Sequence, residues 1–141
     1  MTRIEPKMLS IPHQTLEQIV QRFNAGHTLI DAGALVGGAS AQVILLHVKH
    51  ADGVTQKFLL RAHSENNRWR NPNIASDEFY LLKTLYDSGL PVPQAHYLDE
   101  SGEVYSLPYL IIDYVEGAPD FSPRDLPDFI QQSVELLAKI H

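Results

Sequence analysis

Apolar residues recur along the chain with two spacings, and each spacing indicates a different kind of element. A spacing of three to four residues, typical of one face of an amphipathic helix, is present over 15–23, from about 75 to 87, and from about 127 to the C-terminus. We therefore expect helices in these three ranges. The apolar positions of the first helix are Leu16, Ile19, Val20 and Phe23.

Five shorter segments are rich in aliphatic and β-branched residues and have the length of strands. They cover residues 28–36, 42–49, 57–62, 94–98 and 107–115. The last is the most apolar, so we expect it inside the sheet rather than at its edge. The polar stretch 63–73 shows no such pattern and is expected to be a loop. The order of helix, three strands, helix, two strands, helix predicts an α+β fold with a five-stranded antiparallel sheet and a packed helix.

The composition narrows the class of protein. With 141 residues, 44% of them apolar, the chain is long enough for one compact domain. The absence of cysteine excludes disulfides, thiolate metal sites and a cysteine nucleophile. A net charge of −6 argues against broad binding to nucleic-acid phosphates. No stretch approaches the roughly 20 apolar residues of a membrane span, and the N-terminus lacks the apolar region of a signal peptide, so we expect a cytoplasmic protein.

Three polar features follow one another in the order that nucleotide binding requires. The turn Gly37-Gly38-Ala39-Ser40 joins the first two strands, and the backbone N–H groups of such a turn can approach phosphates closely. Arg61 ends the third strand as a cation for phosphate oxygens. Glu78 shares a helix face with Leu82 and Leu85, so we expect it to point to the sheet and to pair with Arg61. Two adjacent glycines also suit a plain hairpin, and Glu78 also suits a solvated helix N-terminus, so both alternatives stay open.

Six segments in this order resemble the nucleotide-binding lobe of the aminoglycoside phosphotransferase and choline kinase-like small-molecule kinases. The resemblance covers about residues 35–141. It implies a protein kinase-like fold and an ATP-dependent phosphotransferase that acts on a hydroxyl of a small molecule. The matching segments are Leu35-Val-Gly-Gly-Ala-Ser-Ala-Gln-Val43, Phe58-Leu-Leu-Arg61, Asp77-Glu-Phe-Tyr-Leu-Leu-Lys-Thr-Leu85, Gly89-Leu-Pro-Val-Pro93, Tyr109-Leu-Ile-Ile-Asp-Tyr-Val-Glu-Gly117 and Leu137-Ala-Lys-Ile-His141.

On the phosphate side, the resemblance assigns a role to each matching position. The segment Gly37-Gly38-Ala39-Ser40 falls on the family's nucleotide-positioning loop, where backbone amides and the serine hydroxyl would face the phosphates. Arg61 falls where this kinase superfamily usually has a lysine, and Glu78 falls on the acid that pairs with that cation. Arginine departs from the common choice, although its guanidinium can hold phosphate oxygens bidentately.

On the adenine side, the resemblance points to the end of the most apolar segment. Ile112 would guard the back of the adenine pocket. The backbone carbonyl of Asp113, and the N–H and carbonyl of Val115, would form the hydrogen-bonding edge for the base. Because backbone groups do the recognising, a buried strand that runs into a turn accounts for the composition of this segment equally well.

The resemblance also divides the chain into three parts. Residues 1–26 are an N-terminal helical segment, 27–117 the nucleotide-binding lobe, and 118–141 a linker with the first helix of a C-terminal lobe. In this family the phosphotransfer machinery lies in that second lobe and begins with a His-Gly-Asp loop, which occurs nowhere in the 141 residues. We therefore expect ATP as cofactor, Mg²⁺ only together with the missing lobe, no catalytic or metal-binding residue here, and a longer kinase-like parent protein.

The last predicted helix has an apolar side with no expected partner in its own lobe. Its members are Ile130, Val134, Leu137 and Ile140. A large exposed apolar patch is unfavourable in a soluble monomer, and a two-fold contact between copies covers it most simply. We therefore expect a homodimer through this helix, with folding back onto the chain's own sheet as the alternative.

Two other classes of function stay open. One is a nucleotide-binding module without turnover, which the arginine at position 61 favours. The other is a small interaction domain with no nucleotide role. The remaining polar residues have ordinary explanations: His47 and His50 fall on opposite faces of a strand, which does not suit one metal ion, and Asp99, Glu100 and Glu103 gather at a predicted hairpin tip.

Overall fold

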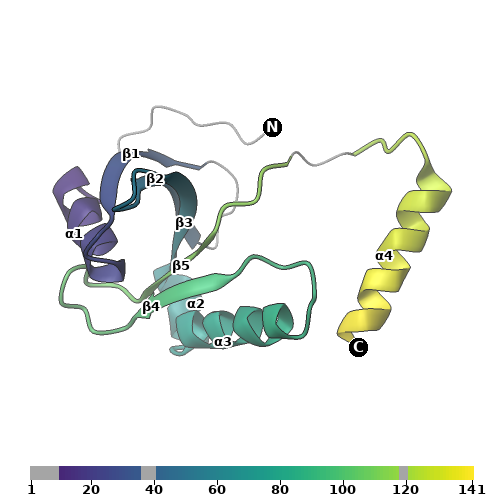
Figure 1. The fold of residues 1–141 in the computed structure, drawn as a ribbon. Helices are drawn as coiled ribbons and strands as arrows, with labels where there is room; N and C mark the ends of the chain where they lie inside the picture. The colour runs from purple at the N-terminus through teal and green to yellow at the C-terminus, as the bar shows by residue number, and fades with distance from the viewer. Residues whose placement is uncertain (1–9, 36–40, 118–120) are drawn as a thin grey trace.

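The computed structural model describes residues 10–35, 41–117 and 121–141. The strands form one antiparallel sheet in the order β1-β2-β3-β5-β4, which confirms the predicted α+β class (Figure 1). The strand β5 lies between β3 and β4, inside the sheet as predicted. The elements are α1 (His13–Phe23), β1 (Thr28–Ala34), β2 (Ala41–Lys49), β3 (Thr55–His63), α2 (Glu65–Arg70), α3 (Ile74–Asp87), β4 (Ala95–Asp99), β5 (Tyr109–Asp113) and α4 (Leu126–Ile140).

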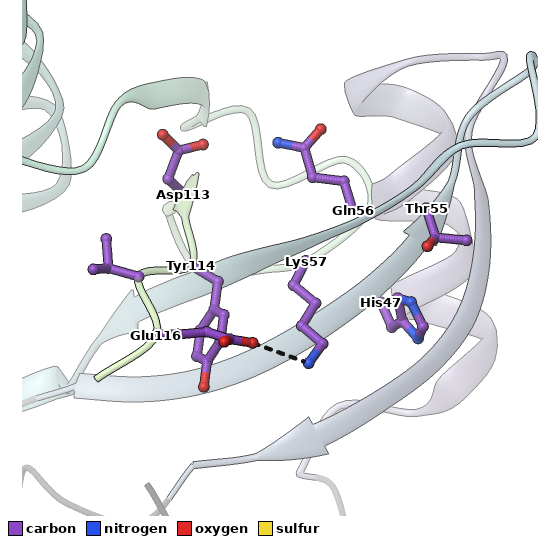
Figure 2. A pocket seen from close by; sticks show the side chains of 8 residues that line it. His47, Thr55, Gln56, Lys57, Asp113, Tyr114 and Glu116 are labelled. Carbon is purple, nitrogen blue, oxygen red and sulfur yellow. Dashed lines mark ion pairs between the residues drawn. The ribbon is translucent and has the colours of Figure 1, made fainter. Parts of the chain in front are cut away.

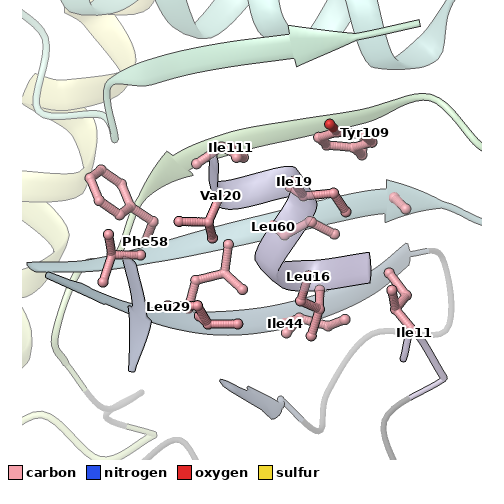
Figure 3. Packing of buried hydrophobic residues seen from close by; sticks show 13 residues of the cluster. Ile11, Leu16, Ile19, Val20, Leu29, Ile44, Phe58, Leu60, Tyr109 and Ile111 are labelled. Atoms are coloured by element: carbon pink, nitrogen blue, oxygen red, sulfur yellow. The ribbon is translucent and has the colours of Figure 1, made fainter. Parts of the chain in front are cut away.

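One face of the sheet is covered by α1 and holds most of the core (Figure 3). Side chains alternate along a strand, so every second residue of the central strands points to this helix. The buried members from α1 are Leu16, Ile19 and Val20, and those from the strands include Ile44, Leu46, Val48, Phe58, Leu60, Tyr109 and Ile111.

The opposite face is only partly covered. Helix α3 packs against β4 and touches β3 and β5. Its smaller core joins Ala75 and Phe79 of α3 to Leu110 and Ile112 of β5, with Leu59 of β3 packed against them. No helix of the described chain has an extended contact with this side of β1 and β2. The whole side of the sheet opposite α1, including the part under α3, is called the uncovered face below.

The stretch 63–73, predicted as a loop, instead contains the helix α2. The Ser64 hydroxyl caps it by accepting a hydrogen bond from the N–H of Asn67 at 3.3 Å, and Glu65 in the first turn complements the helix dipole. None of its residues is buried. The helix is therefore specified by its cap and its charges, and the apolar spacing that marks other helices is absent.

Glu100 and Glu103 lie exposed in the connection between β4 and β5, as predicted, but Asp99 is more than an ordinary turn acid. It is the last residue of β4 and is 5% exposed, its carboxylate lies 2.9 Å from Nε of Arg22 on α1, and the Tyr109 hydroxyl donates to it at 3.1 Å. Burial alone raises the pKa of Asp99, but hydrogen bonds from Ser101 and Tyr109 and the charge of Arg22 outweigh it and keep this pKa below its ordinary value. Burial, together with the Asp99 charge, raises the pKa of Tyr109. The network fastens α1 to β4 and β5 at the margin of the core.

Helix α4 lies apart from the sheet (Figure 1). It begins at the cap Asp125, whose carboxylate accepts from the N–H of Asp128. None of its residues is buried, and the predicted apolar side is exposed as expected. Among the described helices, none is both long and apolar enough to span a membrane.

Candidate functional site

Arg61 and Glu78 meet on the uncovered face, as the sequence predicted. Arg61 lies on β3 and alternates with the core residues Leu60 and Ala62, so its side chain leaves the opposite side of the strand. Its Nη1 donates to Oε1 of Glu78, which reaches the sheet from the second turn of α3. Helix α3 is therefore tied to the sheet by an ion pair beside its small apolar core.

A third side chain joins this pair. His63, the last residue of β3, places Nε2 at 2.5 Å from Oε2 of Glu78. Each oxygen of the carboxylate is thus held by a different residue of the same strand. The His63 side chain is only 11% exposed, and its Nδ1 is buried without a hydrogen-bond partner among the described residues.

The chemistry of this cluster is that of a held cation. A guanidinium has five N–H donors, and Glu78 occupies one of them. The remaining donors of Arg61, whose side chain is 31% exposed, are accessible to a second anion. Planar bidentate donors fit the oxygens of phosphate, and the carboxylate behind them fixes the direction of the guanidinium.

A pocket of about 670 Å³ lies at the other end of the same face (Figure 2). Figure 2 shows Lys57 reaching from β3 toward Glu116, with the Tyr114 ring beside it. The Lys57 Nζ lies 3.6 Å from Oε1 of Glu116 and 5.7 Å from the centre of the ring, a cation–π arrangement. The lining residues are His47, Thr55, Gln56, Lys57, Asp113, Tyr114, Val115 and Glu116.

The segment that follows β5 forms one side of this pocket. Asp113 is the last strand residue, and its carboxylate accepts from His96 Nε2 at 2.6 Å and from the Gln94 N–H at 3.2 Å. The chain leaves the sheet directly after it, two residues earlier than predicted, and Val115 is 65% exposed. The backbone groups of Val115 therefore lie outside the sheet ladder and beside the pocket.

The predicted site residues divide into four groups. Arg61 and Glu78 are brought together, and Asp113 and Val115 border the pocket. Ile112 is buried in the core under α3. The loop Gly37-Gly38-Ala39-Ser40 lies outside the described residues, which end at 35 and resume at 41.

The two ends of the site are joined by one strand. Lys57 and Arg61 are four residues apart on the same side of β3, which corresponds to about 13 Å. Between them lie Leu59, which is half-buried against the small core under α3, and its cross-strand neighbour Leu45 of β2, which is buried. The uncovered face thus offers a charged end, an apolar middle and an open backbone edge.

Sequence reasoning missed the contributions of His63, Lys57 and His96. The strand period places His63 and Lys57 on the same face as Arg61, so their position was within reach of the sequence. The contact of His96 with Asp113 depends on the register between β4 and β5, which contains an irregularity between Ala95 and Tyr97. No sequence signal marks that irregularity.

The class of protein follows from this geometry. A cation on the third strand of an antiparallel sheet, paired with an acid on a helix between the third and fourth strands, is the arrangement found in the amino-terminal lobe of protein kinase-like folds. A model of the phosphotransferase enzyme family (APH) matches residues 31–141, so the chain belongs to this family. Neither a curated protein nor a solved structure gave a significant match.

Proposed function

We propose that the uncovered face binds ATP, and that the chain is the nucleotide-binding lobe of a phosphotransferase acting on a hydroxyl of a small molecule. The ion pair between Arg61 and Glu78 is the observation that carries this proposal. A partly exposed cation that a carboxylate holds in place suits the charged end of a nucleotide. Membership of the phosphotransferase family supports it.

In this proposal each part of the site meets a different part of ATP. The free donors of Arg61 hold oxygens of the α- and β-phosphates, together with the loop Gly37-Gly38-Ala39-Ser40. The backbone carbonyl of Asp113 and the N–H and carbonyl of Val115 bind the adenine edge, behind which Ile112 lies. The length of β3 between Lys57 and Arg61 is one that a nucleoside triphosphate can span.

The lobe binds and orients the nucleotide, and the transfer step requires groups from elsewhere. Mg²⁺ in phosphotransferases is held by carboxylates and phosphate oxygens. Among the described residues, no three acidic, histidine or cysteine side chains gather as candidate metal ligands. Mg²⁺ and the residue that accepts the hydroxyl proton belong, in this proposal, to a C-terminal lobe.

A second candidate is a nucleotide-binding module without turnover. Arginine at the position where lysine is usual in this kinase superfamily is the observation that favours it. Both candidates require nucleotide binding at the same face. They differ only in whether a form of the protein with a C-terminal lobe hydrolyses or transfers the γ-phosphate, and an assay of ADP formation on that form detects both reactions.

Isothermal titration with ATP tests the shared claim. Replacing Arg61 by alanine removes charge-assisted hydrogen bonds, each worth about 1.5–3 kcal/mol, so Arg61→Ala is expected to weaken ATP binding at least tenfold. The matched control is Arg70→Ala, because Arg70 is an exposed arginine on α2. Absence of ATP binding by the unchanged protein, or equal affinity of Arg61→Ala, would contradict the proposal.

We also propose that a second copy of the chain covers α4. The helix carries Asp128 in its first turn and Lys139 in its last turn, so an antiparallel pair places opposite charges together at both ends. Val134 lies near the middle of the apolar side. Light scattering at micromolar concentration is expected to give a dimer, which Val134→Asp converts to a monomer. A 15.8 kDa particle that is insensitive to dilution would contradict the dimer.

A further inference from the structure

We propose that His63 is a positioning residue of this site. Its imidazole holds the second oxygen of Glu78, and so keeps the first oxygen on Arg61 in the direction that nucleotide binding needs. The effect of His63 on ATP binding rests on the proposed function. The position of His63 beside Glu78 rests only on the contacts between β3 and α3.

The geometry makes His63 a direct partner of the acid. Arg61 and His63 are two residues apart on β3 and therefore share a face. They hold Oε1 and Oε2 of Glu78 respectively. A carboxylate held at one oxygen can rotate about its last bond, whereas a carboxylate held at both cannot do so without breaking a hydrogen bond. His63 therefore fixes the acid that in turn fixes the guanidinium.

The surroundings of the ring determine which nitrogen carries the proton. Nδ1 of His63 is buried and has no hydrogen-bond partner among the described residues. A proton at Nδ1 would be left unsatisfied, whereas a proton at Nε2 is donated to Glu78. The arrangement therefore favours the tautomer with its proton at Nε2. Imidazole ¹⁵N chemical shifts distinguish this tautomer directly.

The burial of His63 separates it from an incidental surface contact. The ring is among the few buried polar side chains, and it also borders a cavity of about 510 Å³ that extends toward Arg68 and Gln42. It is followed at once by Ser64, which caps α2. The backbone of His63 is thus fixed on one side by β3 and on the other by a capped helix.

Three variants of the full chain test the role. His63→Phe keeps an aromatic ring and removes the hydrogen bond, so it is expected to weaken ATP binding roughly tenfold, the loss of one hydrogen bond to a charged group. His63→Gln restores an N–H donor and is expected to recover most of the affinity. His13→Phe is the control, because His13 lies exposed on α1, away from this face.

The ¹⁵N NMR measurement of the His63 imidazole does not depend on nucleotide. The expected result is an Nε2–H signal for His63 whose shift changes in Glu78→Gln. A proton at Nδ1, or no response to Glu78→Gln, would overturn the inference. So would equal ATP affinity of His63→Phe and the unchanged protein, or failure of His63→Gln to recover binding. If the unchanged protein binds no ATP, the proposed function fails. The NMR result alone then decides whether His63 donates its Nε2 proton to Glu78.

Discussion

The two faces of the sheet use different kinds of interaction. The face under α1 is closed by aliphatic and aromatic side chains, and its polar network of Arg22, Asp99 and Tyr109 has its charges paired. The uncovered face carries Arg61 and Lys57 with donors that remain accessible to a ligand. Both faces are made by the same strands, through the alternation of side chains.

This difference shows how one strand can serve stability and binding at once. Phe58 and Leu60 of β3 lie in the core, while the residues between and beside them, Leu59 and Arg61, face the site. The core residues set the position of the strand, and the strand sets the position of the site. Changes on the two faces should therefore have different consequences: loss of stability on one and loss of binding on the other.

Leucine truncation should separate the core under α1 from the exposed surface most strongly. Leu16 of α1 is fully buried, whereas Leu81 of α3 is 59% exposed. Leu16→Ala is expected to lower the free energy of unfolding by about 2–5 kcal/mol, because it removes buried methyl groups and leaves a cavity. Urea denaturation followed by circular dichroism measures the change. Leu81→Ala should stay within roughly 0.5 kcal/mol, and an equal loss in both variants would mean that α1 does not cover the core.

The network at Asp99 should give a smaller, pH-dependent effect. At pH 7, Asp99→Asn is expected to cost about 1.5–3 kcal/mol of unfolding free energy, since the carboxylate accepts hydrogen bonds from Ser101 and Tyr109 beside Arg22. The pKa of Asp99 lies below its ordinary value of 3.8 in the folded state. The stability from Asp99 is therefore present above pH 3.8 and lost as the pH falls through the folded pKa.

Unfolding curves at several pH values check this prediction. The difference between the unchanged protein and Asp99→Asn should be constant near neutral pH and shrink below about pH 3.8. Glu103→Gln is the control, because Glu103 also pairs with Arg22 but lies exposed at the rim. A pH-independent difference would show that Asp99 acts through shape rather than charge.

The sequence predicted the fold well because apolar spacing carried the information. The aliphatic and β-branched residues of 42–49 and 57–62 and the helical spacing around Phe79 each identify an element through residues that it buries. Helix α2 buries no residue, so this signal is absent there, and only the cap at Ser64 marks the helix. The ion pair of Asp99 could not be predicted for a related reason. Turn residues indicate a turn, but they carry no information about Arg22, which is 77 positions away in the sequence and reaches Asp99 from α1.

The candidate site was predictable where the regular period of each element fixed the direction of its side chains. The pairing of Arg61 with Glu78 follows from the strand and helix periods together. The contact of His96 with Asp113 does not, because it requires the exact register of β4 against β5. The sequence predicts one strand over 107–115, yet the ladder ends at Asp113. There the Asp113 carboxylate accepts hydrogen bonds from His96 on β4 and from the N–H of Gln94 just before β4.

The most direct test of the account is to map ATP binding onto the two faces by ¹H–¹⁵N NMR. ATP titration is expected to shift the backbone amides of Arg61 and Val115, and of their neighbours along the uncovered face. The amides of α1, including Leu16 and Ile19, should stay unchanged. Shifts concentrated on α1, or no shifts at millimolar ATP, would contradict the claim that the uncovered face is a nucleotide site.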